Sequence, residues 1–160
     1  MGQENTPFLQ KDYTYNDERK TYDVLLEVKV GTKESLKKVT AIVDTGCSSG
    51  IHLCKSFVNT EKLVFIKKIN INPVPVHVAD GHTINADIYK AICQMNGKEE
   101  EIIVSVIDPE KFFEEGEGTI VNVRPLLGRD LLDKYDVLFK GKERKLAISC
   151  SELNNRESSL

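Results

Sequence analysis

The stretch Ala41-Ile42-Val43-Asp44-Thr45-Gly46 decides the fold of this chain. Three apolar residues, two of them β-branched, predict a strand that ends at an acid, a hydroxyl and a glycine. Such a junction projects one carboxylate from a tight turn. The apolar residues before Asp44 would desolvate its carboxylate, and a buried unpaired acid is costly unless it has a function. Asp44 is therefore the first candidate for chemistry.

Strands and tight turns surround this stretch on both sides. Residues 22–30 and 36–43 are β-branched, partly alternating runs on either side of the Gly-containing segment 31–35, which predicts a hairpin. Valine and isoleucine content predicts further strands at 62–71, 75–79, 83–93 and 102–107. Asp80-Gly81 and Asn96-Gly97 separate successive runs, and such pairs favour type I′ turns because both central positions need positive φ.

The C-terminal third adds one helix and two more strands. The segment 126–135 predicts a short helix in which Leu131, Leu132 and Tyr135 share a buried face, and Asp130 could accept from free amides of the first turn. Strands are expected at 137–139 and 145–149 around a turn at Gly141. Residues 51–58 show no clear hydrophobic periodicity, so their secondary structure stays undecided. The pattern is all-β with one late helix, typical of a small closed or sandwiched barrel.

Length and composition limit the possible functions. A chain of 160 residues fits one domain, here expected over 21–150, with a flexible lead-in or an edge segment at 1–20 and a polar tail at 151–160. A net charge of -3 disfavours nucleic acid as a partner. No apolar run approaches the roughly 20 residues of a membrane span, and residues 1–15 contain no secretory signal pattern, so we expect a cytoplasmic protein without a membrane partner. The four cysteines lack CxxC spacing, which predicts reduced structural thiols and no metal.

A second motif, Leu126-Leu127-Gly128, resembles the first in that apolar residues lead to a glycine. With AIVDTG, the hairpin VHVADGHTI and the segment LLGRDLL, the sequence resembles the retropepsin-like aspartic proteases, the single-domain family of retroviral, retrotransposon and cellular homodimeric enzymes. The order and approximate spacing of these segments match over 22–148. The resemblance implies a small closed β-barrel with one short C-terminal helix.

The resemblance also implies roles for individual residues. Asp44 would be the catalytic acid, Thr45 would make a hydroxyl contact across the dimer, and Gly46 would offer its backbone to the substrate. Arg129 and Asp130 resemble a supporting pair at the helix start. Substrate would bind between two segments, a flap comprising Val78, Ala79, Asp80, Gly81 and His82, and a loop comprising Leu126, Leu127 and Gly128, which cradles the turn of Asp44.

Three features depart from the viral pattern. Ser48 stands where viral members usually carry an acid, so Arg129 lacks its customary partner. The flap lacks the viral run of glycines, and the segment 112–124 is longer than the viral connection. None of these departures removes the acid at Asp44.

The chemistry of acid proteolysis determines how many copies of the chain form one active site. It uses two carboxylates about 3 Å apart that share one proton, one acting as base on water and the other donating to the carbonyl oxygen. One Asp-Thr-Gly motif per chain therefore predicts a homodimer that cleaves an extended peptide or protein without a cofactor. The alternative is an inactive dimer of the same fold that binds or scaffolds peptides, which Ser48 and the altered flap favour.

Other candidate groups give weaker signals. Ser48, Ser49 and His52 lie close in sequence, but no Gly-x-Ser-x-Gly elbow frames them, so we interpret them as turn residues. His77 and His82 flank the flap and are expected to be surface residues, with a substrate or pH role as the alternative. Cys47 follows the turn directly and is interpreted as filler, with a redox role as the alternative.

Overall fold

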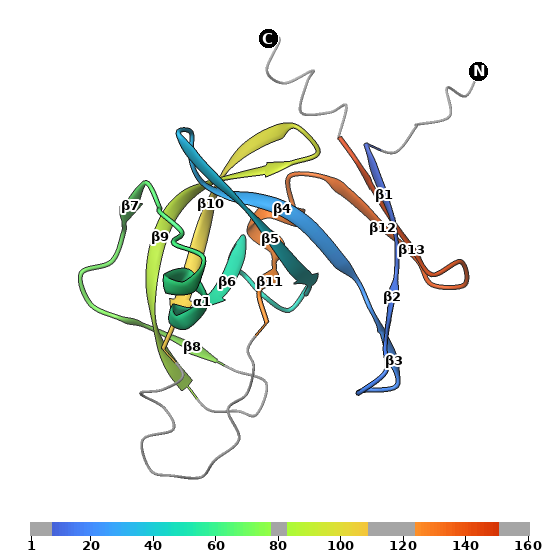
Figure 1. Ribbon diagram of the computed structural model, residues 1–160, viewed down its shortest axis with the longest axis horizontal. Helices are drawn as coiled ribbons and strands as arrows, with labels where there is room; N and C mark the ends of the chain where they lie inside the picture. The colour runs from blue at the N-terminus through green and yellow to red at the C-terminus, as the bar shows by residue number, and fades with distance from the viewer. Residues whose placement is uncertain (1–7, 78–82, 109–123, 151–160) are drawn as a thin grey trace.

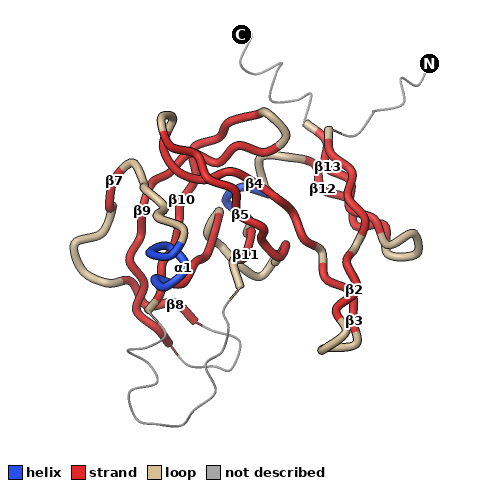
Figure 2. Tube along the Cα trace, viewed as in Figure 1, coloured by secondary structure: helices blue, strands red, loops and turns tan. Residues whose placement is uncertain are grey.

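The computed structural model describes residues 8–77, 83–108 and 124–150. Strands make up most of this part, and two short helices accompany them. Figure 1 and Figure 2 show how these elements are arranged. No helix in these ranges is long and apolar enough to cross a membrane.

Six strands form a closed ring. Going round it, each strand is hydrogen-bonded to the next, and the last pairs with the first. The order is β4 (Leu25–Thr32), β5 (Ser35–Val43), β11 (Leu126–Leu127), β6 (Ile51–Cys54), β10 (Lys98–Ile107) and β9 (Thr83–Met95). Two pairings, β5 with β11 and β6 with β10, are parallel, and the other four are antiparallel. The predicted small closed barrel is thus confirmed.

Two smaller sheets and two strands extend the ring. The strands β7 (Lys67–Lys68) and β8 (Val74–His77) pair with β9. A separate sheet has the order β1 (Leu9–Asp12), β13 (Lys145–Ser149), β12 (Asp136–Lys140). A short ribbon pairs β2 (Thr14–Asn16) with β3 (Thr21–Asp23). Figure 1 shows the three-stranded sheet and this ribbon on one side of the ring.

The apolar faces of the ring and of the three-stranded sheet enclose the main core, and a smaller cluster forms around Cys54, Ala86 and Ile107. The helix α3 (Arg129–Leu132) contributes to this core, whereas α1 (Lys55–Thr60) contains no buried residue. Leu131, Leu132 and Tyr135 are all buried, as their shared face predicted. The largest fully buried side chains are Leu26, Ile51, Leu53, Met95, Ile102, Ile107, Leu127, Leu131, Leu146, Ile148, Val28 and Val30.

The predicted hairpins largely agree with the structure. The strands β4 and β5 form the first hairpin, and β12 and β13 form the last. Asn96 and Gly97 connect β9 to β10 with φ of 48° and 85°, the positive values that a type I′ turn requires. The other predicted turn, Asp80-Gly81, lies outside the described residues.

Some boundaries differ for identifiable reasons. The expected strand 62–71 is reduced to β7, because the side chain of Asn70 replaces further backbone pairing with β9. Its Oδ1 accepts from Ile88 N at 2.7 Å, and its Nδ2 donates to Ala86 O at 3.3 Å. The undecided segment 51–58 divides into β6 and α1. The helix expected within 126–135 begins only at Arg129, because Leu126 and Leu127 pair as a strand. In the lead-in, residues 9–12 form an edge strand on β13, and residues 14–16 form β2, so the strands begin before residue 21.

Candidate active site

Asp44 directly follows the central strand β5 of the ring. Strands on both sides hold the end of β5: Ile42 N donates to Pro125 O at 2.9 Å, and Val43 N donates to Val24 O at 2.8 Å. The backbone N–H of Asp44 itself donates to Leu127 O at 2.9 Å. The position of the carboxylate is therefore determined by the sheet.

The turn after Asp44 orients its side chain. Gly46 N donates to Asp44 Oδ1 at 2.9 Å, and Cys47 N donates to Asp44 O at 3.1 Å. A carboxylate that accepts from the amide two residues later is a common device of tight turns. Asp44 is half-buried, while Thr45 and Gly46 are exposed. The Asp-Thr-Gly turn thus presents its polar groups at the surface.

The segment Leu126 to Gly128 lies directly behind this turn, as the sequence resemblance implied. Gly128 N donates to Gly50 O at 2.9 Å, and Arg129 N donates to Cys47 O at 2.8 Å. A Cβ atom at Gly128 would lie 2.2 Å from Ser49 O and 2.5 Å from Cys47 O. Only glycine fits this approach of two backbones. Leu127 is buried in the core, and Leu126 is half-buried.

Arg129 and Asp130, the predicted supporting pair, lie in two different environments. Asp130 Oδ2 accepts from Ile103 N in β10 at 2.8 Å, and the N-terminus of α3 has no side-chain cap. The expectation that Asp130 caps the helix is therefore wrong: its carboxylate connects the helix to the ring. Ile103 O also accepts from Gly50 N at 2.8 Å, so this part of β10 supports the loop of Asp44 as well. The side chain of Arg129 is exposed.

A buried hydrogen-bonded group lies beneath the loop. Ser49 Oγ donates to Ser105 Oγ at 2.8 Å, and Ser105 Oγ lies 2.6 Å from His52 Nδ1. Burial lowers the pKa of His52, and the negative charge of Asp44 opposes this effect. The neutral imidazole and the Ser105 hydroxyl then share one hydrogen bond, and the tautomer of His52 sets which of them donates. Sequence reasoning missed Ser105, because only the parallel register of β6 and β10 places it opposite His52.

Cys47 is half-buried beside the turn. Burial raises the pKa of its thiol, while a hydrogen bond with the Ser49 backbone lowers it by less. A thiol whose pKa is raised is a poor nucleophile. This environment agrees with the interpretation of Cys47 as filler.

The flap residues Val78, Ala79, Asp80, Gly81 and His82 lie outside the described residues, so their role stays a prediction. The strands β8 and β9 on either side of them do pair, with His77 opposite Thr83. The Thr83 hydroxyl lies 3.3 Å from His77 Nδ1 at this exposed end. A hairpin therefore leads to the predicted flap.

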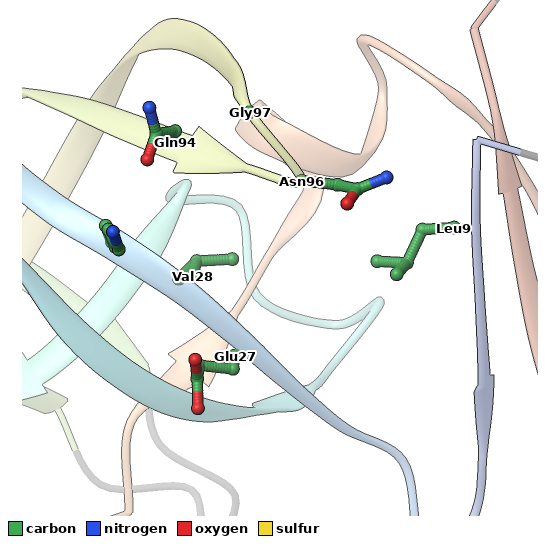
Figure 3. Close-up of a pocket in the computed structure, with 7 residues that line it drawn as sticks. Leu9, Glu27, Val28, Gln94, Asn96 and Gly97 are labelled. Carbon is green, nitrogen blue, oxygen red and sulfur yellow. The ribbon is translucent and has the colours of Figure 1, made fainter.

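A pocket of about 300 Å³ lies elsewhere. Figure 3 shows its residues on β1, β4, the end of β9 and the β9–β10 turn, none of them a candidate site residue: Leu9, Glu27, Val28, Lys29, Gln94, Asn96 and Gly97. Within the described ranges, no group of three or more His, Cys, Asp or Glu side chains is arranged to hold a metal ion.

A solved structure has the same architecture over three quarters of this chain. The EIAV protease complexed with the inhibitor HBY-793 superposes with a TM-score of 0.51 at 18% sequence identity, covering 75% of this chain and 91% of that one. The simian foamy virus (mac) protease aligns with a TM-score of 0.32 at 16% identity, covering 60% of this chain and all of the other. No protein-family model and no curated protein matches the sequence. At 18% identity, the first likeness establishes the fold.

Proposed function

We propose that this chain, whose fold is that of the retropepsin-like aspartic proteases, is an aspartic endopeptidase that acts as a homodimer. One observation carries the proposal. Asp44 stands at the end of β5 in an Asp-Thr-Gly turn, with its backbone bonded to Leu127 and its Oδ1 bonded to Gly46 N. A fixed carboxylate at an exposed turn suits general acid–base chemistry.

The chemistry requires a second copy of Asp44. Two carboxylates close together cannot both ionise, so a pair of Asp44 side chains would share one proton. The ionised member takes a proton from water as it attacks the peptide carbonyl, and the protonated member donates to the carbonyl oxygen. Each chain supplies one such acid. Thr45 and Gly46 are both exposed. In this proposal Thr45 contacts the turn of the partner subunit, and Gly46 offers its backbone to the substrate.

The proposed substrate is an extended peptide. Such a segment would add as a strand between the flap and the floor formed by Asp44 and Leu126, with backbone hydrogen bonds supplying affinity and side-chain pockets supplying specificity. No cofactor takes part in this proposal.

The test compares digestion of a peptide library at several pH values by the wild-type protein and by Asp44→Asn. We expect the variant to lose cleavage while its fold and oligomeric state persist, because only the ionisable oxygen is replaced. Asp17→Asn, which makes the same change at an exposed turn, serves as the matched control and should cleave normally. Cleavage by Asp44→Asn at the wild-type rate would refute the assignment.

A second candidate function is peptide binding without cleavage. It is favoured by Ser48, an exposed serine where viral members usually carry an acid. Under this proposal the wild-type dimer would retain library peptides intact at every pH, and Asp44→Asn would retain them equally well. The same digestion experiment, read by mass spectrometry of bound and free peptides, distinguishes the two functions.

A further inference from the structure

A hydrogen-bonded chain of three side chains runs from the loop of Asp44 into the ring. Ser49, in this loop, donates from Oγ to Ser105 Oγ at 2.8 Å, and Ser105 Oγ lies 2.6 Å from His52 Nδ1. His52 is 6% exposed and Ser105 is 1% exposed. Buried polar groups are costly unless they are paired, so each member of the chain depends on the next. The chain therefore links the loop of the candidate acid to a buried titratable group.

Strand register places His52 between two strands that support the candidate site. His52 lies opposite Ser105 of β10 and opposite Leu126 of β11. Side chains directly opposite each other on paired strands lie on the same face of a sheet. The strand β11 also holds the acid, because Leu127 O accepts from Asp44 N at 2.9 Å. The imidazole of His52 thus shares a face of the sheet with Leu126, directly beneath the loop.

Among the described residues, Asp44 is the charged group that acts on His52. Burial lowers the pKa of the imidazole, and the carboxylate of Asp44 opposes this with a smaller effect. On β6 itself, burial raises the pKa of the Cys54 thiol to about 11, with a smaller contribution from Asp108, so this thiol is uncharged at neutral pH. In the loop, burial raises the pKa of the Cys47 thiol as well. The other neighbours on the same face of β10 and β11 are apolar: Ile103, Ile107 and Leu126.

A proton gained by His52 would reverse the direction of the chain. Ser105 accepts from Ser49 and has its own hydroxyl proton to donate, which suits a neutral imidazole that carries its proton on Nε2 and accepts at Nδ1. In the imidazolium both ring nitrogens donate, so the Ser105 proton must turn away from Nδ1. It then points toward Ser49, whose own proton loses its acceptor. The neutral and charged forms of His52 therefore hold the loop differently.

We propose that neutral His52, acting through Ser105 and Ser49, is a positioning residue for the carboxylate of Asp44, and that protonation of His52 displaces the loop from its catalytic position. The inference rests on the proposed function, since the placement of Asp44 affects cleavage only if Asp44 is the acid. A displacement of about 1 Å can lower the rate of a reaction about a hundredfold, so a small movement of the loop suffices.

Breaking the chain at its buried middle tests the positioning role. Ser105→Ala should lower kcat about tenfold or more and leave KM within about twofold of wild type, because the change lies beneath the loop. Val30→Ala removes buried contacts at the other end of the β4–β5 hairpin, and this control for lost stability should keep the wild-type kcat. A wild-type kcat in Ser105→Ala, or an equal loss in both variants, would contradict the role.

Two substitutions of His52 separate its hydrogen bond from its shape. Asparagine places an oxygen or nitrogen at the position of Nδ1, whereas leucine places a methyl group there. We expect His52→Asn to keep most of the wild-type kcat and His52→Leu to lose it. Asparagine cannot gain the proton that displaces the loop, so His52→Asn should also retain its kcat to lower pH than wild type. Equal losses in the two variants, or an unmoved acid limb of kcat in His52→Asn, would count against the proposal.

NMR of the imidazole nitrogens tests the link without any cleavage. The chain has three histidines, and the signal of His52 is the one that His52→Asn removes. We expect the neutral ring to carry its proton on Nε2, and we expect Asp44→Asn to lower the pKa of His52 further, because it removes a negative charge. Asp17→Asn, at an exposed turn, should leave that pKa unchanged. A neutral ring protonated at Nδ1, or a pKa that does not respond to Asp44→Asn, would overturn the inference.

The outcomes also separate this inference from the proposed function. If Asp44→Asn abolishes cleavage while Ser105→Ala and His52→Leu cleave like wild type, the positioning role is wrong and the endopeptidase stands. If no sample cleaves peptides while the imidazole shows the expected tautomer and response to Asp44→Asn, the endopeptidase is wrong and the link between His52 and Asp44 stands.

Discussion

At the residue scale, Gly128 shows how little room the candidate site allows. Its φ of -119° and ψ of -171° are open to any residue, so its backbone conformation does not require glycine. The constraint comes from Ser49 O and Cys47 O, which occupy the space of a side chain. The loop that carries Asp44 can therefore sit against Leu127 only if residue 128 has no Cβ.

Gly128→Ala should destabilise the fold by about 2 kcal/mol and lower cleavage, because the added methyl must displace the loop of Asp44. Gly141→Ala is the control, since nothing lies within 4 Å of a Cβ there, and its unfolding free energy should stay within about 1 kcal/mol of wild type. Denaturant unfolding measures both. Equal stability of the two variants would show that the loop of Asp44 can move aside for the added methyl group without lowering the unfolding free energy.

His52 should make stability depend on pH. Burial lowers its pKa in the folded state below the ordinary value of about 6.5, so the unfolded chain binds more protons once the pH falls below that value. The contribution is complete above about pH 6.5 and is lost as the pH falls toward the folded pKa. The melting temperature should fall between about pH 7.5 and pH 5, and the fall should be smaller in His52→Gln. Parallel curves for the two proteins would rule out this role of His52.

The residues that could be predicted from sequence are those marked by local motifs. Asp44, Gly46 and Gly128 each belong to a short pattern whose spacing has a physical reason. Ser105 belongs to no such pattern, and it joins the site only through a hydrogen bond across 56 positions of sequence. Its environment depends on strand register, which a single sequence does not specify.

At the element scale, α3 and β10 depend on one side-chain hydrogen bond. Asp130 Oδ2 accepts from Ile103 N, and Ile103 O accepts from Gly50 N in the loop of Asp44. The helix, the ring and the loop therefore share a single backbone residue of β10. A helix of four residues gains little from propensity alone, so this contact and the burial of Leu131 and Leu132 fix its position.

Asp130→Ala should cost about 1–3 kcal/mol of unfolding free energy, because it leaves the Ile103 N–H without its acceptor. Asp130→Asn keeps a side-chain carbonyl that can accept the same bond, so its stability should lie nearer to wild type. Thermal or denaturant unfolding compares the two. If Asp130→Ala were as stable as Asp130→Asn, the hydrogen bond to Ile103 would contribute nothing to the stability of the fold.

Elements that close locally could be predicted, and elements that depend on distant partners could not. The β4–β5 and β12–β13 hairpins and the Asn96-Gly97 turn follow from neighbouring residues. The shortness of β7 depends on Asn70 meeting β9, and the strand nature of Leu126 and Leu127 depends on β5 and β6. In both places a tertiary contact overrides the local pattern.

At the scale of the whole molecule, the ring leaves Asp44 at its surface and the three-stranded sheet beside it. The fold was predictable because hairpin order and two motifs together are much more specific than either alone. The pairing of β9 with β4, which closes the ring, was not visible in the sequence. Under the proposed function, activity depends on assembly, since each chain carries one acid of the proposed pair.

Mixing wild-type protein with Asp44→Asn tests this dependence. After verified exchange of equal amounts, about a quarter of the dimers contain two wild-type chains, and activity per wild-type chain should fall to about half. Activity should also fall on dilution as dimers dissociate. Activity that remains proportional to the wild-type chain would show that each chain carries a whole site.

The pairing of β1 with β13 also affects when the three-stranded sheet can form during folding. Leu9 lies opposite Ile148, so β1 leaves the ribosome long before β13, the strand with which it pairs. Contacts between such distant segments carry a large loop-closure entropy and slow the folding of small β proteins. The three-stranded sheet cannot form during synthesis until β13 has emerged. Completion of the sheet is therefore a late step of folding, which waits for the synthesis of all three of its strands.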